Sequence, residues 1–471
     1  MRRLAQRVLP GALILLAGCS FIPAYERPAP PVAAHWPVLA QTAGVRAVAG
    51  LSWQQMLPDP RLQALINAAL EHNRDLRIAV ARVEEARALY GISRADRLPT
   101  VNLGAAQAAA RLPGGLSATG NEQISRRYDI NLGVAAFELD FWGRVKSLSA
   151  SALASYLASA EARESFRLTL IADVANAYLA WQEMDERLSL ARATVENRKD
   201  LRFLVQKRRE VGLAGDLDFL AADGAHAAAR AQLSELERGR AQAENALNLL
   251  VGKVPADLPP RRRLSEQDLP LDITVDVPAE VLLHRPDVRA AEQKLIAANA
   301  NIGAARAAFL PRIGLSLAFG TASRTLSGLF DSGTGAWSFA PSLVQPLFDG
   351  GRTQGGVDLA DARKLIAVAE YEKTIQQAFR EVADLLVARD RLAEQLMAQE
   401  AAEKAQNERL RLVDARYRAG VSSYLEVLDA QRDAFATSQG TLQLRRALLV
   451  TAAQLYKALG GGQEIERGRN T

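Results

Sequence analysis

Three residues near the end of this chain could act on ions as a group. Leu425, Glu426 and Asp429 have spacings that place them on one side of a helix. Repeated around a symmetry axis, Asp429 would form a ring of carboxylates and Leu425 a ring of aliphatic side chains. Converging carboxylates bind cations and raise one another's pKa, and an aliphatic ring can close a pore by dewetting. The alternative is that both acids are solvated on an ordinary helix face.

The only thiol, Cys19, follows a segment with the pattern of an export signal. Residues 2–7 hold three arginines, and the apolar run that follows, residues 8–17, is too short to span ~30 Å of hydrocarbon. The small residues just before the cysteine resemble the lipobox of bacterial lipoproteins, and Ser20 after it resembles lipoproteins sent to the outer membrane. We predict that Cys19 carries a covalent lipid such as palmitate; the alternative is an ordinary signal peptide with an incidental cysteine.

The sequence offers little support for nucleotide binding, hydrolysis or metal binding. No Gly-rich phosphate loop ending in Gly-Lys-Ser/Thr, no Gly-x-Ser-x-Gly elbow and no His-Glu-x-x-His pair occurs. Four scattered histidines and one cysteine do not make a disulfide framework or a tetrahedral metal site. Removal of the signal segment lowers the net charge from +5 to +2, too little for a nucleic-acid partner. We therefore expect no enzyme, no metal and no cofactor apart from the lipid.

The elements that must position these residues occur twice in the 471-residue chain. The offset between matching residues changes from 212 to 208 between residues 99 and 139, so the first copy has four extra residues, which we expect in a surface loop. The matched segments keep one order: 72–77 with 284–289, 98–99 with 310–311, 143–144 with 351–352, Gly212 with Gly420, and 251–252 with 459–460. The predicted divisions are a signal peptide (1–18), an acylated Pro-rich extension (19–60), a first repeat (61–252), a Pro-rich linker (253–285), a second repeat (286–460) and a tail (461–471).

Each copy has the same internal plan. A helix, residues 61–97 or 287–309, ends at a Leu-Pro pair, and two stretches with a period of two then predict one β-hairpin. A run without proline or glycine follows, 145–208 or 357–419, long enough for a helix of about 95 Å. The glycines at 212 and 420 end these runs, and we expect the next helices to be capped by Asp216, Ser422 and Ser423.

The number of predicted strands bears on how the chain assembles. Four strands cannot close a transmembrane barrel, and an open sheet edge is not tolerated in lipid. If the strands lie in a membrane, several chains must pool them. The alternative is a small soluble sheet packed on a helical bundle.

Three stretches carry a family resemblance: FELDFWGR (137–144), LLHRPDVRAAE (282–292) and QPLFDGGR (345–352). Together they resemble the outer-membrane efflux protein family, the TolC-like group, over nearly the whole mature chain. With the lipobox, the sequence is similar to the OprM/NodT-type lipoproteins of this family.

The resemblance implies a mainly α fold with β: a homotrimer whose four strands per chain form a 12-stranded outer-membrane β-barrel. A long α-helical periplasmic barrel and a mixed equatorial domain continue it. It also implies a passive exit duct of a tripartite system in a Gram-negative bacterium. An inner-membrane transporter of RND type and a periplasmic adaptor (membrane fusion) protein would deliver small molecules to it, as in multidrug resistance.

The resemblance also assigns roles at the helix–turn–helix tips, residues 208–220 and 416–428. It places the closed periplasmic gate at Leu425, Glu426 and Asp429. It matches Tyr417 and Asp218 to a hydrogen-bonded latch between neighbouring coiled coils. Ser422 stands where the best-known member has an arginine, and Arg418 or Arg208 is the candidate substitute.

Two other functions are compatible with the sequence. One is a periplasmic coiled-coil lipoprotein with a structural or adaptor role, although adaptors have one helical hairpin and this chain has two copies of its plan. The other is the exit duct of a type I protein secretion system. Detergent dependence and a pore in electrophysiology would separate the first from a channel.

Overall fold

The computed structural model describes residues 20–34, 36, 46–47, 52–116, 120–267, 273–274 and 279–461. The predicted signal peptide and Cys19 lie outside them. The described residues form two compact units, one from those within 1–29, 82–160 and 290–371, the other from those within 30–81, 161–289 and 372–471. Each unit takes part of both sequence repeats, because the longest helices continue from one unit into the other.

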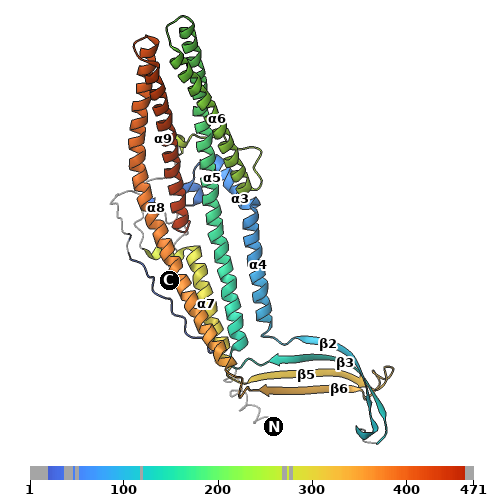
Figure 1. The fold of residues 1–471 in the computed structure, drawn as a ribbon. Helices are drawn as coiled ribbons and strands as arrows, with labels where there is room; N and C mark the ends of the chain where they lie inside the picture. Colours follow the sequence, from blue (N-terminus) through green and yellow to red (C-terminus); the bar gives the residue numbers. More distant parts are fainter. Residues whose placement is uncertain are drawn as a thin grey trace. The chain divides into compact units, whose positions relative to one another are not determined.

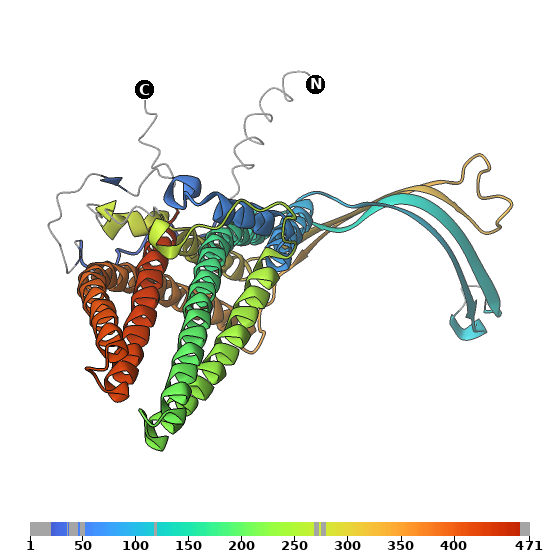
Figure 2. The same cartoon turned by 90° about the horizontal axis from the view of Figure 1, so that it is seen from above.

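Two helical hairpins dominate the second unit (Figures 1 and 2). Helix α5 (Arg144–Glu210) returns as α6 (Asp216–Val251), and α8 (Arg352–Arg418) returns as α9 (Tyr424–Ala458). The long helices α5 and α8 have 67 residues each, which corresponds to about 100 Å. Gly212 and Gly420 have φ of 79° and 78° in the turns, a conformation that side chains with a Cβ disfavour. The predicted long helices and their glycine stops are confirmed.

The first predicted helix is wrong as a single element. The structure has α3 (Pro60–His72) and α4 (Arg74–Ala95), separated by Asn73, whose backbone is extended. The Asn73 side chain accepts a hydrogen bond from the Leu76 N–H (2.8 Å) and donates one to the Leu250 carbonyl (2.8 Å). One side chain caps both the start of α4 and the end of α6. These two hydrogen bonds outweigh the backbone hydrogen bonds that an unbroken helix would form.

The second copy uses the same device with a different residue. Helix α7 (Pro286–Ala307) follows the 3₁₀ helix η3 (Ala279–His284), and Arg285 lies between them. The buried Arg285 guanidinium donates to the Ala458 carbonyl at the end of α9 (2.6 Å) and pairs with Asp287 and Glu381. The 212 offset aligns Arg285 with Asn73. In both repeats, therefore, the residue that precedes α4 or α7 caps the C-terminal end of the return helix, α6 or α9.

The caps of the return helices differ from the prediction. Ser423 is the N-cap of α9 and forms a capping box with Glu426, as expected for one of the three candidates. Gly215, not Asp216, is the N-cap of α6, and no side chain caps it. Ser422 precedes the cap of α9. The N-cap residue has non-helical backbone angles, and the position of the turn glycine determines which residue adopts them.

Each repeat contributes one β-hairpin to the first unit, as predicted. Strands β2 (Val101–Leu112) and β3 (Gln123–Glu138) form one, and β5 (Arg312–Ser323) and β6 (Gly335–Val344) the other. They lie side by side in the antiparallel order β2-β3-β5-β6 (Figure 1).

The four extra residues of the first copy do not lengthen its loop. The β2–β3 ladder pairs 101–112 with 123–134, whereas the β5–β6 ladder pairs 312–321 with 335–344. A bulge between Val134 and Phe137 takes up further residues, and Ala136 adopts a φ of 51° there. The extra residues thus lengthen the paired strands β2 and β3, where backbone N–H and C=O groups form hydrogen bonds with the neighbouring strand.

The remaining described elements are short. Helix α2 (Trp53–Met56) precedes α3, and buried side chains gather on α3 and on residues 168–181 of α5. The two-residue strands β1 (Arg46–Ala47) and β4 (Ile273–Thr274) pair in parallel, and η1 (Gly114–Leu116) and η2 (Leu264–Glu266) are single 3₁₀ turns. No helix within the described residues is both long and apolar enough to cross a membrane.

Candidate functional site

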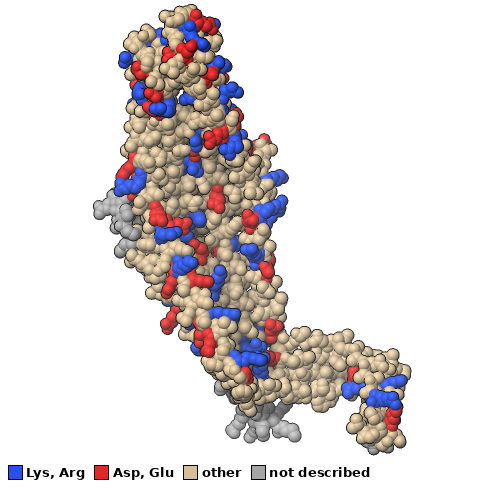
Figure 3. All heavy atoms as spheres, in the orientation of Figure 1, with Lys and Arg blue, Asp and Glu red and all other residues tan. Residues whose placement is uncertain are grey.

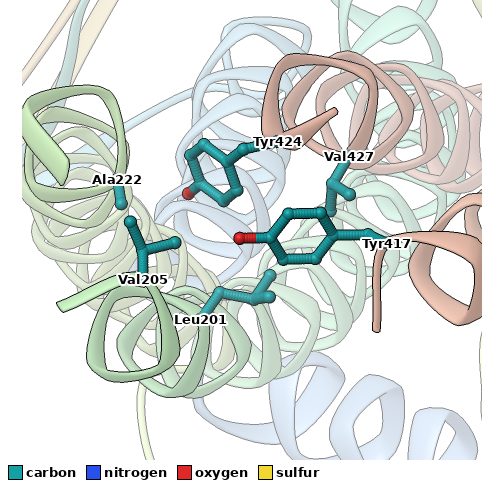
Figure 4. Close-up of a cluster of buried hydrophobic side chains, with 6 residues drawn as sticks. All are labelled: Leu201, Val205, Ala222, Tyr417, Tyr424 and Val427. Carbon is teal, nitrogen blue, oxygen red and sulfur yellow. The ribbon is translucent and has the colours of Figure 1, made fainter. Parts of the chain in front are cut away.

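The tips of the two helical hairpins meet through a buried cluster (Figure 4). The Tyr417 and Tyr424 rings lie 5.7 Å apart at a tilt of 54°, and both hydroxyls point toward the α5–α6 hairpin. The cluster thereby joins the end of α8 and the start of α9 to the end of α5 and the start of α6. Its members are Leu201, Val205, Ala222, Tyr417, Tyr424 and Val427.

Arg208 adds a second link between the hairpins. Its guanidinium carbon lies 4.6 Å from the centre of the Tyr417 ring. The same group donates to the backbone carbonyls of Tyr417 (3.4 Å) and Arg418 (3.4 Å), at the C-terminal end of α8. A cation over an aromatic face and at a helix C-terminus is favoured by both the ring quadrupole and the helix dipole. Arg208 therefore fastens the end of α5 to the end of α8.

Asp218 lies half-buried beside the tyrosine pair. Burial comes first among the causes that raise the pKa of Tyr417, and the nearby Asp218 carboxylate acts in the same direction. Burial, with Tyr417 and Asp218 nearby, raises the pKa of Tyr424 to about 12. In the described part of its own chain Asp218 makes no hydrogen bond or ion pair. Of the four predicted latch residues, the structure brings together Tyr417, Arg208 and Asp218, whereas Arg418 pairs with Asp414 of its own helix (2.8 Å).

The three predicted gate residues have different surroundings. The Leu425 side chain is 65% exposed, and the half-buried Asp429 forms an ion pair, among the described residues, only with Arg432 of its own helix (3.2 Å). Glu426 accepts hydrogen bonds from the Ser423 N–H (3.2 Å) and hydroxyl (3.1 Å), and these donors lower its pKa. Leu425 and Asp429 are thus available at the surface of α9, while Glu426 is engaged in its cap.

Sequence reasoning missed a set of exposed apolar residues at the same tips. Leu217 is 81% exposed and matches Leu425 under the 208 offset, so the repeat could have identified it. The same offset places Ala221 opposite Asp429, and the carboxylate therefore belongs to one hairpin alone. The other exposed apolar residues of the tips are Val211, Leu213, Leu220 and Val421.

The sheet presents two chemically different faces. Its register aligns Leu103, Leu132, Phe319 and Trp337 across all four strands on one face. The Trp337 and Phe319 side chains on that face are 77% and 71% exposed. The opposite face carries small and polar residues: Asn102, Gly104, Asn131, Gly133, Ala318, Gly320, Ala336 and Ser338.

Charge is nearly absent from most of this sheet. Strand β6 has no charged residue, and those of β2 and β3 lie mostly toward the loop ends, at Arg111, 126–127 and Asp129. In Figure 3 the visible surface of the sheet is accordingly uncharged over most of its length, with acidic and basic residues at its far end. Both outer strands, β2 and β6, have one neighbour only among the described strands. An apolar face, a small polar face and two open edges are what a partial membrane barrel would present.

Within the described residues, no group of three His, Cys, Asp or Glu side chains is arranged to hold a metal ion.

Comparisons with known proteins agree over nearly the whole chain. A family model described as outer membrane efflux protein matches residues 65–253 and 277–461. The toluene efflux pump outer membrane protein TtgF of Pseudomonas putida is 46% identical over 460 residues, which is 95% of each chain. The outer membrane protein OprJ of Pseudomonas aeruginosa is 44% identical over 455 residues, covering 96% of this chain and 95% of that one.

Solved structures show the same fold. A membrane protein from Pseudomonas aeruginosa is 42% identical, with a TM-score of 0.87 over 94% of this chain and all of that one. The open state of the Neisseria gonorrhoeae MtrE outer membrane channel is 39% identical, with a TM-score of 0.83 over 94% of this chain and 98% of that one.

Proposed function

Because this chain belongs to the outer membrane efflux protein family, we propose that three copies of it form the exit duct of a tripartite efflux pump. The chain is an outer-membrane efflux channel protein with a TolC-like fold. The observation that carries the proposal is the sheet with one apolar face and two open edges.

Three-fold assembly would satisfy those edges. An unpaired strand edge leaves N–H and C=O groups without partners, which costs several kcal/mol per group in hydrocarbon. If β6 of each copy pairs with β2 of the next, three copies supply twelve strands and leave no edge. The apolar face then meets lipid, and the face with Asn131, Gly133 and Ser338 lines the pore, the alternation that outer-membrane barrels use.

The partners follow from this position in a pump. A channel in the outer membrane has no energy source of its own, and relatives such as TtgF are named as the outer membrane proteins of pumps. We infer an inner-membrane transporter of RND type and a periplasmic adaptor, with small molecules as cargo. The exposed apolar side chains of the tips are a suitable surface for the adaptor.

A gate at the hairpin tips is part of the same proposal. Around a threefold axis, Asp429 would form a ring of three carboxylates and Leu425 a ring of three aliphatic side chains. The Arg208–Tyr417 contact and the buried tyrosine cluster would hold the hairpins in the closed arrangement. Asp218, half-buried and without an ion pair in the described part of its own chain, is free to accept a hydrogen bond from a neighbouring copy.

We also propose that Cys19 carries the lipid. An acylated terminus needs two or three chains to hold a protein firmly to a leaflet. Cells grown with labelled palmitate should label the wild-type protein and not Cys19→Ser.

Two adjacent residues of β6 test the membrane role of the sheet. Phe339 lies on the apolar face and Ser338 on the polar face. On a lipid face near the midplane, Arg or Lys costs about 2–4 kcal/mol and an acid less, so Phe339→Asp should assemble poorly in the outer membrane. Ser338→Asp adds the same charge toward the pore and should assemble and conduct in planar bilayers. Equal assembly of both variants would contradict the proposed orientation, and a wild-type protein without pore activity would exclude the duct.

A further inference from the structure

An extended N-terminal segment covers one side of α7 in the first unit. We call residues 20–27 the strap. Arg27 makes a double hydrogen bond with the Glu292 carboxylate (2.7 and 2.9 Å), and the Tyr25 hydroxyl donates to the same group (3.1 Å). Two and three turns further along, Asn299 donates to the Pro23 carbonyl (2.8 Å), and Gly303 lies against Ile22. A Cβ on Gly303 would be 2.6 Å from Ile22 Cγ1.

The opposite side of α7 borders a recess of about 490 Å³. Successive helix residues are rotated by about 100°, so Lys294 points roughly 200° away from Glu292. The recess residues of α7 follow Lys294 at helical spacings of three, four and seven. The α7 residues that contact the strap, Asn299 and Gly303, follow Glu292 at seven and eleven residues and so stay on the opposite side. The lining combines α5, α7 and α8: Leu148, Ser151, Ser155, Lys294, Ala297, Ala298, Asn301, Ala304, Ala305, Gly356, Leu359, Ala360 and Arg363.

The strap indicates which side faces the duct. It begins one residue after Cys19, the proposed site of lipid attachment. A lipid-bearing terminus must reach the leaflet from outside the barrel, so the strap lies on the outer surface of the helical wall. The recess lies on the other side of α7 and therefore on the inner surface.

The chemistry of the recess is that of a site for an amphiphilic anion. Lys294 and Arg363 form no ion pair or hydrogen bond with the described residues. Ser151 and Asn301 supply a hydroxyl and an amide donor, and Leu148 and Leu359 are exposed apolar side chains. The alanine and glycine floor leaves room for an aromatic or aliphatic body. Two cations beside donors and apolar walls favour a carboxylate or sulfonate on an apolar skeleton.

We propose that this recess is a transit subsite in the wall of the duct that binds organic anions with an apolar body. The inference rests on the proposed exit duct. In this geometry the anionic head contacts Lys294 and Arg363, and the body lies against the leucines. Because the site is open, binding is weak and a solute can leave it again, as conduction requires.

Block of single channels in planar bilayers tests the subsite. The probe is 2-naphthalenesulfonate, and naphthylmethyltrimethylammonium supplies a similar ring with the opposite charge. The double variant Lys294→Ala/Arg363→Ala should weaken block by the sulfonate roughly tenfold. The charge reversal Lys294→Glu/Arg363→Glu should weaken it further and introduce block by the ammonium probe. Lys364→Ala is the matched control, since it removes a neighbouring cation of α8 that does not line the recess.

The outcomes separate the two proposals. A wild-type protein that forms no channel would overturn the proposed duct and, with it, the subsite. A conducting wild type with the same sulfonate block in all variants would overturn the subsite alone. A loss of block in Lys364→Ala equal to that in the double variant would assign the effect to general surface charge and would also overturn it.

Discussion

Acidic residues at the tips have different roles although their side chains are chemically similar. Glu426 and Asp429 are two carboxylates less than one turn apart on α9. Glu426 is held by the Ser423 donors, which lower its pKa, so its contribution to the cap is present above its ordinary pKa and is lost as the pH falls through the lowered value. Asp429 has one exposed partner, Arg432. Asp429 is therefore the acid that can respond to ions.

Asp429→Ala should raise single-channel conductance or weaken block by divalent cations. A ring of three carboxylates attracts a divalent ion strongly, and we expect its apparent affinity to fall roughly tenfold without it. Glu408→Ala is the matched control, because Glu408 is an exposed acid paired three residues along its own helix with Arg411. Unchanged conductance and block in Asp429→Ala would remove this residue from the gate.

Two aligned glycines make a similarly matched pair. Gly303→Ala places a Cβ against the Ile22 backbone and side chain and 2.8 Å from Ser147 Oγ, so the strap and the Ser147 side chain must shift. Gly91, its counterpart under the 212 offset, has nothing within 4 Å of the new Cβ, and Gly91→Ala should be neutral or stabilise α4 by up to about 1 kcal/mol. Chymotrypsin should cleave after Tyr25 faster in Gly303→Ala than in the wild type or Gly91→Ala. Equal cleavage rates would show that the strap does not depend on this contact.

At the scale of elements, polar side chains fasten helix ends to one another. Asn73 and Arg285 occupy equivalent positions and cap α6 and α9, respectively, although one is an amide and the other a guanidinium. At the tips, Arg208 likewise caps a helix end, because its side chain donates to a carbonyl at the end of α8. The Arg208 contact is partly exposed, whereas Arg285 is buried.

Arg208→Ala should loosen the contact between the α5–α6 and α8–α9 hairpins. Loss of the cation–π contact and the carbonyl contacts should cost about 1–2 kcal/mol. The expected result is higher conductance and greater entry of a large antibiotic that an intact outer membrane excludes. The side chain of Arg416, the counterpart in the second repeat, is exposed and makes no ion pair or hydrogen bond with the described residues, so Arg416→Ala is the control. If both variants behave like the wild type, Arg208 is not a latch residue.

At the scale of the whole molecule, the predicted family, fold class and outer-membrane location are confirmed by the relatives and solved structures. The assembly stays a prediction. Both outer strands of the sheet lack a second neighbour in the described part of the chain, and only additional copies can supply one in lipid.

The mature protein extracted in detergent should therefore sediment with three times the mass of one chain. The reason is that the β2 and β6 edges must pair between copies to leave no backbone group exposed to hydrocarbon. Analytical ultracentrifugation with the detergent contribution subtracted is the measurement. The Phe339→Asp variant provides the comparison, since a chain that fails to assemble should sediment as a monomer. A monomeric wild type would contradict the pooled barrel.

Several features of this protein could be predicted from the sequence because their signals are local or repeated. Long runs without proline or glycine determine α5 and α8, and the period of two determines the four strands. The order of matching segments reveals the repeat. The Ser423–Glu426 cap also follows from a four-residue pattern.

Other features depend on residues that are far apart in the chain, and only the tertiary structure decided them. The break at Asn73 is stabilised by Leu250, 177 residues away, and Arg208 reaches carbonyls 209 and 210 residues away. The strap meets α7 across a separation of 265 residues at Arg27 and Glu292. Such contacts arise from packing between elements, and residue spacing along one element carries no information about them.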